Sequence, residues 1–364
     1  MLSPDHAPTC DIFCRVIDNY GDIGVCWRLA RQLRDEHGWR VRLWVDDIAA
    51  CAQLTKNESI SGIEVHEWLA DFPAVAPARI VIEAFACELP ENYLHAMAAS
   101  EQKSVWLNLE YLCVENWGAG VHLQPSPHPR LPLTKYFFVP GVLPGTGGVL
   151  RESELLERQA GFDVAAARKK YTTDTSGTWA FLFCYDNPAL PMLLDAWAAG
   201  TQTVHCLVAA GKPHAQVAQW LDEDFTASAR RGNLHLHPLP FVAQHDFDEL
   251  LWTCDLNFVR GEDSFCRALW AAKPFLWHIY PQHEEAHWAK LAEFHAHYAA
   301  PAVLTAFSDL WNGITVPSPR AIAEAWKQFS AALPELKPRT EAWRKRLEPL
   351  GDLAGNLAFF CKNR

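Results

Sequence analysis

The feature that most constrains the fold is a regular alternation of apolar runs and amphipathic stretches in the second half of the chain. Short runs rich in Val, Leu, Phe and Trp predict buried strands, and the segments between them have helical spacing. The predicted strands are 179–184, 203–208, 234–237, 255–259 and 274–279, and the predicted helices are 190–199, 215–221, 246–253 and 264–272. Such alternation requires a parallel sheet covered by helices on both faces.

The first half has the same pattern in a less regular form. An apolar run, a polar turn, a helix with Val25, Leu29 and Leu33 at a spacing of four, and a second apolar run form a βαβ unit with parallel strands. The predicted strands are 12–17, 41–45, 79–82 and 104–108, and the predicted helix is 25–34. Residues 124–148 are dense in Pro and Gly and predict an irregular end to this half.

The length favours two domains, because a single hydrophobic core stops growing near ~250–300 residues and this chain has 364. We predict an α/β protein with one Rossmann-like domain over 1–155 and another over 156–349. The helix expected over about 350–364 carries enough apolar residues to pack back on the first domain.

Charge and composition exclude several classes of function. A formal net charge of −11 argues against a nucleic-acid-binding protein, which needs a basic face to neutralise phosphates. No apolar run approaches the ~18 residues of a membrane span, and the first residues do not have the pattern of a signal peptide. Eleven cysteines, an odd number without C-x-x-C pairs, are expected to be core residues of a cytoplasmic protein.

Ligands of open parallel sheets bind beyond the carboxyl ends of the strands, and the loop over 18–24 is one such place. Gly21 and Gly24 allow a tight turn and a close backbone approach, but the loop lacks the G-x-G-x-x-G pattern. Asp18 and Asp22 suggest a general base, or acceptors for a hydroxyl-rich or cationic substrate. Alternatively, they are a helix cap and a turn residue.

A second polar loop, Arg260-Gly-Glu-Asp-Ser264, lies between a predicted strand and a predicted helix. The start of that helix is an anion site, to which Arg260 can add a charged donor. Glu262, Asp263 and Ser264 can bond the hydroxyl groups of a ribose or sugar. The alternative is an ordinary acidic helix cap.

A third pattern, His283-Glu-Glu-Ala-His287, matches the H-E-x-x-H motif of zinc peptidases on a predicted helix. Its position directly after a parallel strand in a βα series does not fit such a peptidase. A zinc metallopeptidase using His283, Glu284 and His287 nevertheless remains an alternative, because the spacing of the motif is suitable for zinc. An NAD-binding oxidoreductase with Asp46 or Asp47 as the ribose-binding acid is another.

Taken together, these segments resemble the EarP family of protein-arginine rhamnosyltransferases, which modify bacterial translation elongation factor P (EF-P). The resemblance runs over the whole chain. It is carried by residues 15–33 (RVIDNYGDIGVCWRLARQL), 185–188 (YDNP), 257–275 (NFVRGEDSFCRALWAAKPF) and 279–282 (IYPQ).

The resemblance implies a GT-B fold, in which two Rossmann-like domains face each other across a cleft. It also implies an inverting transfer of rhamnose from dTDP-β-L-rhamnose, without a metal or other cofactor, to an arginine of EF-P. The second domain would hold the nucleotide and the first the acceptor. We further expect a monomer that has no direct nucleic-acid or membrane partner.

The resemblance also implies roles for individual residues. Asp22 would be the general base and, with Asp18, would face the sugar and the acceptor, and Glu262 would be essential. Phe241 would stack on thymine, and the nucleotide diphosphate would contact Tyr185, Gln244, Arg260, Asp263 and Ser264. We add Asn19, Tyr20, Gly21 and Gly261, from the same two loops, to the candidate donor-binding residues. A non-catalytic module that binds a translation partner is a further alternative.

Overall fold

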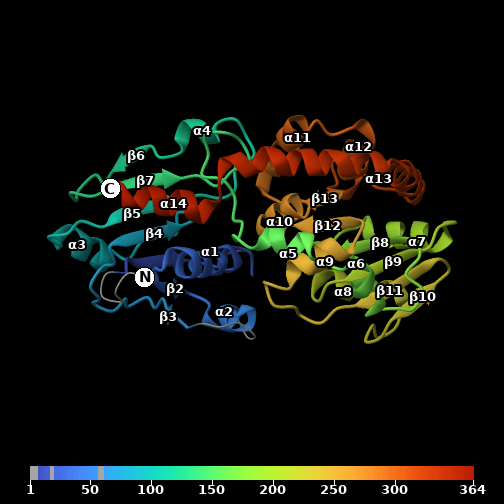
Figure 1. Ribbon diagram of the computed structural model, residues 1–364, viewed down its shortest axis with the longest axis horizontal. Helices are drawn as coiled ribbons and strands as arrows, with labels where there is room; N and C mark the ends of the chain where they lie inside the picture. Colours follow the sequence, from blue (N-terminus) through green and yellow to red (C-terminus); the bar gives the residue numbers. More distant parts are fainter. Residues whose placement is uncertain (1–6, 17–19, 56–60) are drawn as a thin grey trace. The chain divides into compact units, whose positions relative to one another are not determined.

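The computed structural model describes residues 7–16, 20–55 and 61–364, and its chain divides into two compact units. Unit 1 comprises Met1–Ser153 and Leu347–Arg364, and unit 2 comprises Glu154–Arg346. Each unit contains one twisted sheet with helices packed on it (Figure 1). Among the described residues, no helix combines the length and the apolar character needed to cross a bilayer.

The sheet of unit 1 has seven strands in the order β3-β2-β1-β4-β5-β7-β6. All neighbouring strands are parallel except β6, which is antiparallel to β7. The strands are β1 Thr9–Cys14, β2 Arg40–Val45, β3 Ile63–Glu67, β4 Ile80–Ala84, β5 Val105–Leu109, β6 Pro125–Pro127 and β7 Thr134–Phe138.

Both faces of this sheet are covered, as the apolar character of β1, β4 and β5 requires. On one face, helix α1 buries Ile23, Trp27 and Leu33, together with residues of α14. On the other face, Phe13 and Trp44 belong to a cluster rich in aromatic residues. The helices of unit 1 are α1 Gly21–His37, α2 Ile48–Leu54, α3 Glu91–Ala99, α4 Gly118–Val121, η3 Glu348–Leu350 and α14 Leu353–Lys362.

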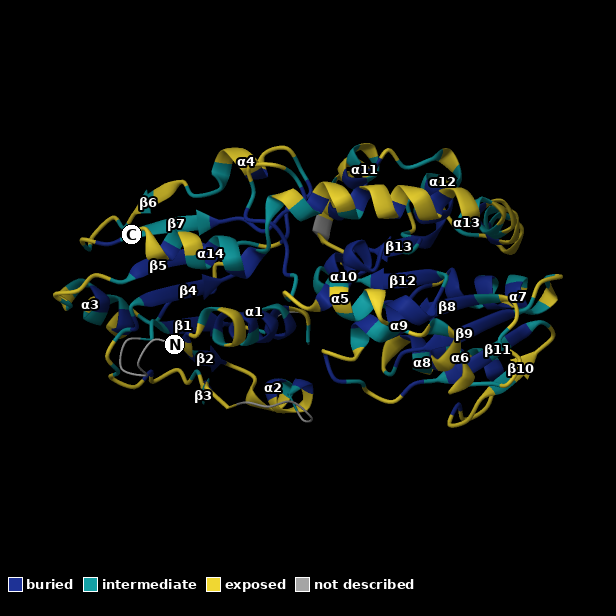
Figure 2. Ribbon diagram, in the orientation of Figure 1, coloured by how far each residue is buried: buried dark blue, intermediate teal, exposed yellow. Residues whose placement is uncertain are grey.

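The sheet of unit 2 has six strands in the order β10-β11-β9-β8-β12-β13. Only β10 is antiparallel to its neighbour. The strands are β8 Thr178–Leu182, β9 Val204–Val208, β10 Ala229–Arg231, β11 Leu234–Pro238, β12 Leu256–Arg260 and β13 Phe275–His278. In Figure 2 the parallel strands form the buried interior of the unit, whereas the edge strand β10 is largely exposed.

Helices surround this second sheet on both faces. They include one of 29 residues, α13, that contains two prolines. The helices of unit 2 are α5 Leu155–Ala160, α6 Val164–Lys169, α7 Leu190–Ala199, α8 Lys212–Leu221, α9 Phe247–Thr253, α10 Asp263–Ala271, η2 His283–Glu285, α11 Ala286–Tyr298, α12 Ala302–Trp311 and α13 Pro319–Leu347.

Both sheets have the strand order of a Rossmann fold. Counted along the chain, the parallel strands of unit 2 run 3-2-1-4-5, and unit 1 begins with the same order. The order reverses between β1 and β4 in unit 1 and between β8 and β12 in unit 2. Ligands of such sheets bind at the carboxyl ends of the strands where this reversal occurs. The predicted α/β class with two Rossmann-like parallel sheets is confirmed.

The βα alternation predicted for the second half is confirmed, and α7 has the predicted bounds. Three details of the first half were wrong. The first strand spans Thr9–Cys14 rather than 12–17, and α1 begins at Gly21, so residues predicted as a turn are helical. Residues 124–148 are not all irregular, because β7 joins the sheet as a parallel strand beside β5.

All eleven cysteines are buried and reduced, as predicted for core residues. Burial raises the pKa of the Cys184 thiol to about 12 and that of Cys51 to about 11. The C-terminal helix α14 lies in unit 1, where it contacts α1.

Candidate active site

The strongest concentration of motif residues in unit 2 lies where β8 and β12 end. Arg260 is the last residue of β12, and its guanidinium carbon lies 4.5 Å from the ring centroid of Phe183 and 4.8 Å from that of Tyr185. Its Nη1 also donates a hydrogen bond of 3.3 Å to the carbonyl of Cys184. The segment after β8 therefore holds the planar cation of Arg260 by ring stacking and a backbone acceptor.

Tyr185 is itself fixed by two aromatic side chains at the end of β13. Its ring packs edge to face against His278 at 5.3 Å and against Tyr280 at 5.4 Å between ring centroids. His278 is buried, and burial, reinforced by the charge of Arg260, lowers its pKa to about 3. His278 is therefore neutral near pH 7, and Arg260 supplies the positive charge of this cluster.

The turn between β12 and α10 is organised by backbone contacts. Gly261 has a φ of 60°, which favours glycine, and its carbonyl accepts a 2.7 Å hydrogen bond from Trp277 Nε1. The hydroxyl of Ser264 accepts from the N–H of Arg260 at 3.0 Å and donates to the carbonyl of the same residue. This turn places the N-terminus of α10 directly after Arg260, which is the arrangement of an anion site.

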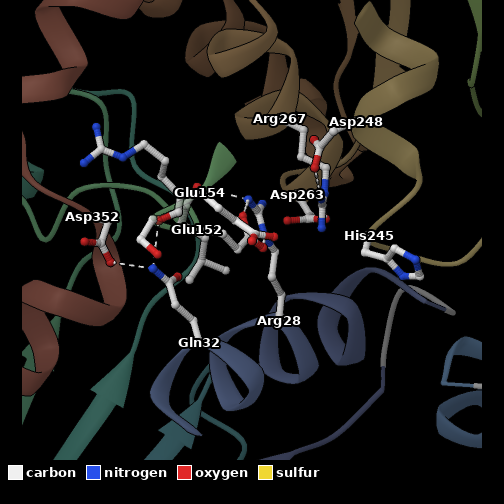
Figure 3. A network of polar contacts seen from close by, with 12 residues as sticks. Arg28, Gln32, Glu152, Glu154, His245, Asp248, Asp263, Arg267 and Asp352 are labelled. Atoms are coloured by element: carbon white, nitrogen blue, oxygen red, sulfur yellow. Dashed lines mark hydrogen bonds and ion pairs between the residues drawn. The ribbon is translucent and has the colours of Figure 1, made fainter. Parts of the chain in front are cut away.

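The acids of this loop have cationic neighbours. Glu262 is paired with Lys290 of α11 at 3.1 Å. Asp263 binds Arg267 at 2.8 Å, and the buried Arg267 also binds Asp248 of α9 at 2.7 Å (Figure 3). These ion pairs hold the start of α10 against α9 and α11.

The sequence prediction did not single out Lys290, Arg267 or Asp248. Arg267 follows Asp263 by four residues on one helix, a spacing that could have indicated the pair. Lys290 lies 28 residues after Glu262 on another helix, and no pattern indicates that contact.

Phe241 and Gln244 lie on the segment after β11, another carboxyl end of the same sheet. Residue Phe241 is 43% exposed, whereas Gln244 is buried. An exposed aromatic ring at this edge is suited to stacking on a planar ligand. β11 lies two strands from β8, and neighbouring strands are about 4.8 Å apart. The ends of these two strands are therefore roughly 10 Å apart.

In unit 1, Asp22 lies on α1, the helix that follows β1. It stands in the first turn of α1, with its residue surface only 5% exposed, and Tyr20 precedes it as the N-cap residue. Gly21 is the first helical residue. A buried carboxylate in the first turn is favoured by the helix dipole. Asp18 and Asn19 lie outside the described residues.

Two acids that a dinucleotide site would use have other contacts. Asp46 accepts the N–H of Val16 at 2.9 Å, which ties the segment after β1 to the end of β2. Asp47 is the N-cap of α2 and accepts the N–H of Ala50 at 2.9 Å. These contacts give both acids structural roles and weaken the oxidoreductase alternative.

The zinc-peptidase pattern does not lie on one continuous helix. Glu284 and Glu285 have φ values of 56° and 61°, so the helix is interrupted between the two histidines and α11 begins only at Ala286. The prediction that the motif lies on a helix was wrong. His287 Nδ1 accepts the N–H of Gln282 at 3.1 Å. Within the described residues, no three His, Cys, Asp or Glu side chains are grouped to hold a metal ion.

Comparison with known proteins identifies the family to which this chain belongs. The model of the EF-P rhamnosyltransferase family EarP matches residues 10–362. The chain belongs to the EarP family. A protein-arginine rhamnosyltransferase of Pseudomonas putida KT2440 is 45% identical, over 98% of this chain and 99% of its own length. The resemblance predicted from the sequence is confirmed.

Solved structures agree with this assignment. The structure that describes EarP-mediated arginine glycosylation of EF-P has a TM-score of 0.68 at 36% identity, covering 98% of this chain and 99% of its own. A glycosyltransferase of kitacinnamycin has a TM-score of 0.58 at 13% identity, covering 98% of this chain and 99% of its own, and shares the fold alone. The EarP-family chain is thus a GT-B enzyme, and its class is glycosyltransferase, as predicted.

Proposed function

We propose that this EarP-family enzyme transfers L-rhamnose from dTDP-β-L-rhamnose to an arginine side chain of EF-P, with inversion at the anomeric carbon. The named activity of its relatives supports the reaction class. The observation in the structure that carries the proposal is the stacking of Arg260 on Tyr185 directly before the N-terminus of α10. We further propose that the enzyme works as a monomer in the cytoplasm.

The donor would bind to unit 2. Arg260 and the first-turn amides of α10 would receive the diphosphate, with Gly261 allowing its close approach and Ser264 holding the turn. Tyr185 would line the same site, and Phe241 would stack on thymine beside Gln244. The neutral His278 would support Tyr185 without adding a charge.

No metal is needed in this proposal. The diphosphate gains negative charge as the bond to the sugar breaks. A fixed guanidinium and a helix N-terminus stabilise such charge without reorganising during the reaction. Arg260 is suited to this task because ring stacking already holds its side chain.

The acceptor chemistry would be the task of Asp22 together with Asp18, while Asn19, Tyr20 and Gly21 of the same loop would contribute to donor binding. Full deprotonation of an arginine at pH 7 costs on the order of 8 kcal/mol, from ~6 pKa units at ~1.36 kcal/mol each. One carboxylate does not offset this cost. Two acids can hold the guanidinium in a bidentate contact and accept its proton while the C–N bond forms.

Glu262 and Asp263 would act through their ion pairs. Glu262 bound to Lys290, and Asp263 bound to Arg267, would fix the start of α10 against the diphosphate. Glu262 would therefore be essential, because loss of its ion pair would let α10 shift and misplace the anion site.

The proposal is tested with three ligands and one assay. Thermal-shift measurements should show stabilisation by dTDP-rhamnose and none by NAD or zinc, because only a ligand of the native state raises its apparent stability. Release of dTDP should then require EF-P, and NMR should report inversion of the anomeric configuration. Stabilisation by NAD or zinc instead, with no dTDP release, would support one of the alternatives.

A further inference from the structure

Helix α1, which carries Asp22 in its first turn, also binds the segments by which the chain leaves and re-enters unit 1. The chain passes into unit 2 after Ser153 and returns at Leu347. Arg28, Gln32 and Glu36 follow at a spacing of four on α1 and therefore lie along one side of the helix. Each of the three binds one or both of these segments.

The contacts to the outgoing segment are made mainly by the buried side chain of Arg28. Arg28 donates from Nε and Nη2 to the two oxygens of Glu152 at 2.7 and 2.6 Å, and from Nη2 to the carbonyl of Leu150 at 3.3 Å. Arg28 is only 1% exposed. Glu36 accepts the N–H of Ser153, the last residue of the segment, at 2.8 Å. A bidentate arginine–carboxylate pair gives geometric specificity as well as energy.

The incoming segment is bound to the same helix. Gln32 Nε2 donates to the carbonyl of Arg151 at 2.8 Å and to Asp352 Oδ1 at 2.9 Å, so one amide group joins the two segments (Figure 3). The N–H of Leu353 also donates to the carbonyl of Val149 at 3.2 Å. We call Arg28, Gln32, Glu36, Glu152 and Asp352 the α1 clamp.

We propose that Arg28 and Glu152 are positioning residues of the transferase, which hold the connections between the units in a fixed relation to Asp22. This inference rests on the proposed function of Asp22. The helix is a rigid link, because its 17 residues are continuous and ten of them are buried. Loosening its contact with Glu152 frees the connections to move relative to the base, while the donor-binding side chains of unit 2 are unaffected.

The expected signature is a loss of kcat at unchanged donor affinity. A misplacement of about 1 Å caused far from the reacting atoms can cost about 100-fold in rate. We therefore expect Arg28→Lys, which keeps the charge and loses the bidentate contact, to reduce kcat by about 10- to 100-fold. Glu152→Gln should act alike and serves if Arg28→Lys fails to fold.

A matched control exists in the same unit. Arg42 binds Asp11 in the same bidentate way, at 2.5 and 2.6 Å, but it contacts Asp11 near the opposite, amino end of β1. Arg42→Lys removes the same kind of contact and lowers the melting temperature without touching the clamp. It should keep kcat within about threefold of the wild-type value at a temperature where all variants are folded.

The experiment measures kcat with EF-P and dTDP-rhamnose, dTDP-rhamnose affinity by calorimetry, and interatomic distance distributions by small-angle scattering. Wild-type transfer tests the proposed function, and the ratio of variant to wild type tests the clamp. A large loss of kcat and a broader distance distribution for Arg28→Lys alone, at unchanged affinity, support the inference. Equal losses in Arg42→Lys, or a wild-type kcat in folded Arg28→Lys, overturn it. If the wild type does not transfer rhamnose, the proposed function fails, but scattering still tests the clamp. Identical distance distributions for the wild type and Arg28→Lys would then overturn the clamp.

Discussion

The guanidinium of Arg260 lies over the ring of Tyr185, with its central carbon 4.8 Å from the ring centroid. Arg260 ends strand β12 and Tyr185 follows strand β8, and these two strands are neighbours where the strand order of the second sheet reverses. A cation held by an aromatic ring at this position, directly before a helix N-terminus, has the character of a phosphate site.

Replacement of Arg260 tests this site. Arg260→Ala should weaken binding of dTDP-rhamnose by about 10- to 150-fold, because a hydrogen bond to a charged group contributes about 1.5–3 kcal/mol. Arg260→Lys should restore only part of the affinity, since lysine lacks the planar fork. Isothermal calorimetry measures both values, and an unchanged affinity in Arg260→Ala would contradict the assignment.

Asp22→Asn separates the chemical step from donor binding. The amide keeps the size of the side chain and cannot accept the proton, so kcat should fall by about 100- to 10,000-fold. Donor affinity should stay within about threefold of the wild-type value, because the residues proposed to bind the nucleotide diphosphate lie in unit 2. Strong loss of dTDP-rhamnose binding by this variant would argue against its role as a base.

The buried acid Asp11 should be important for stability rather than activity. It is fully buried and accepts hydrogen bonds from Arg42, Trp44, Tyr93 and the N–H of Ala78. Removing one partner of a buried pair costs about 3–5 kcal/mol. Urea unfolding of Asp11→Ala should show this loss, and a loss below about 1 kcal/mol would mean that water replaces the carboxylate.

Stability should fall as the pH is lowered from about 6.5 to 4. Burial lowers the pKa of His237 to about 4, so the unfolded chain binds a proton in this range that the folded chain does not. The contribution of the neutral His237 to the free energy of unfolding is therefore fully present above pH 6.5. Below that pH, the free energy of unfolding falls by up to about 1.4 kcal/mol per pH unit for each histidine of this kind.

The variant His237→Gln should reduce that slope by about one proton in urea titrations at several pH values. The control is His95→Gln, because His95 is exposed and its replacement changes no buried titratable group. Equal slopes for the His237→Gln variant and the wild type would show that His237 remains protonated in the folded protein.

Chelation should leave the transfer rate unchanged. The helix is interrupted at Glu284 and Glu285, so the zinc-like pattern does not lie on one continuous helix. Dialysis against EDTA, followed by assay and by elemental analysis for zinc, checks this expectation. Loss of activity that returns only with zinc would support a zinc-dependent enzyme instead.

The sequence predicted the architecture because both sheets are built from short apolar strands separated by amphipathic helices. It also indicated the candidate site in unit 2, because polar residues stand where buried strands end, as Arg260 does at the end of β12; the roles of these residues stay predictions. It placed the first strand three residues too late, since Val16 and Ile17 extend the apolar run beyond the last paired residue, Cys14.

Contacts between distant segments were beyond prediction. Arg28 and Glu152 are 124 residues apart, and nothing in either segment indicates the other. The interrupted helix at Glu284 and Glu285 also escaped prediction, because glutamate is a good helix former and local propensity favours the wrong structure.

The most direct measurement is mass spectrometry of EF-P after incubation with this protein and dTDP-rhamnose. The account predicts one deoxyhexose added to one arginine by the wild-type protein, and no addition by Asp22→Asn at equal concentration. Unmodified EF-P with the folded wild-type protein, or the sugar on a residue other than arginine, would contradict it.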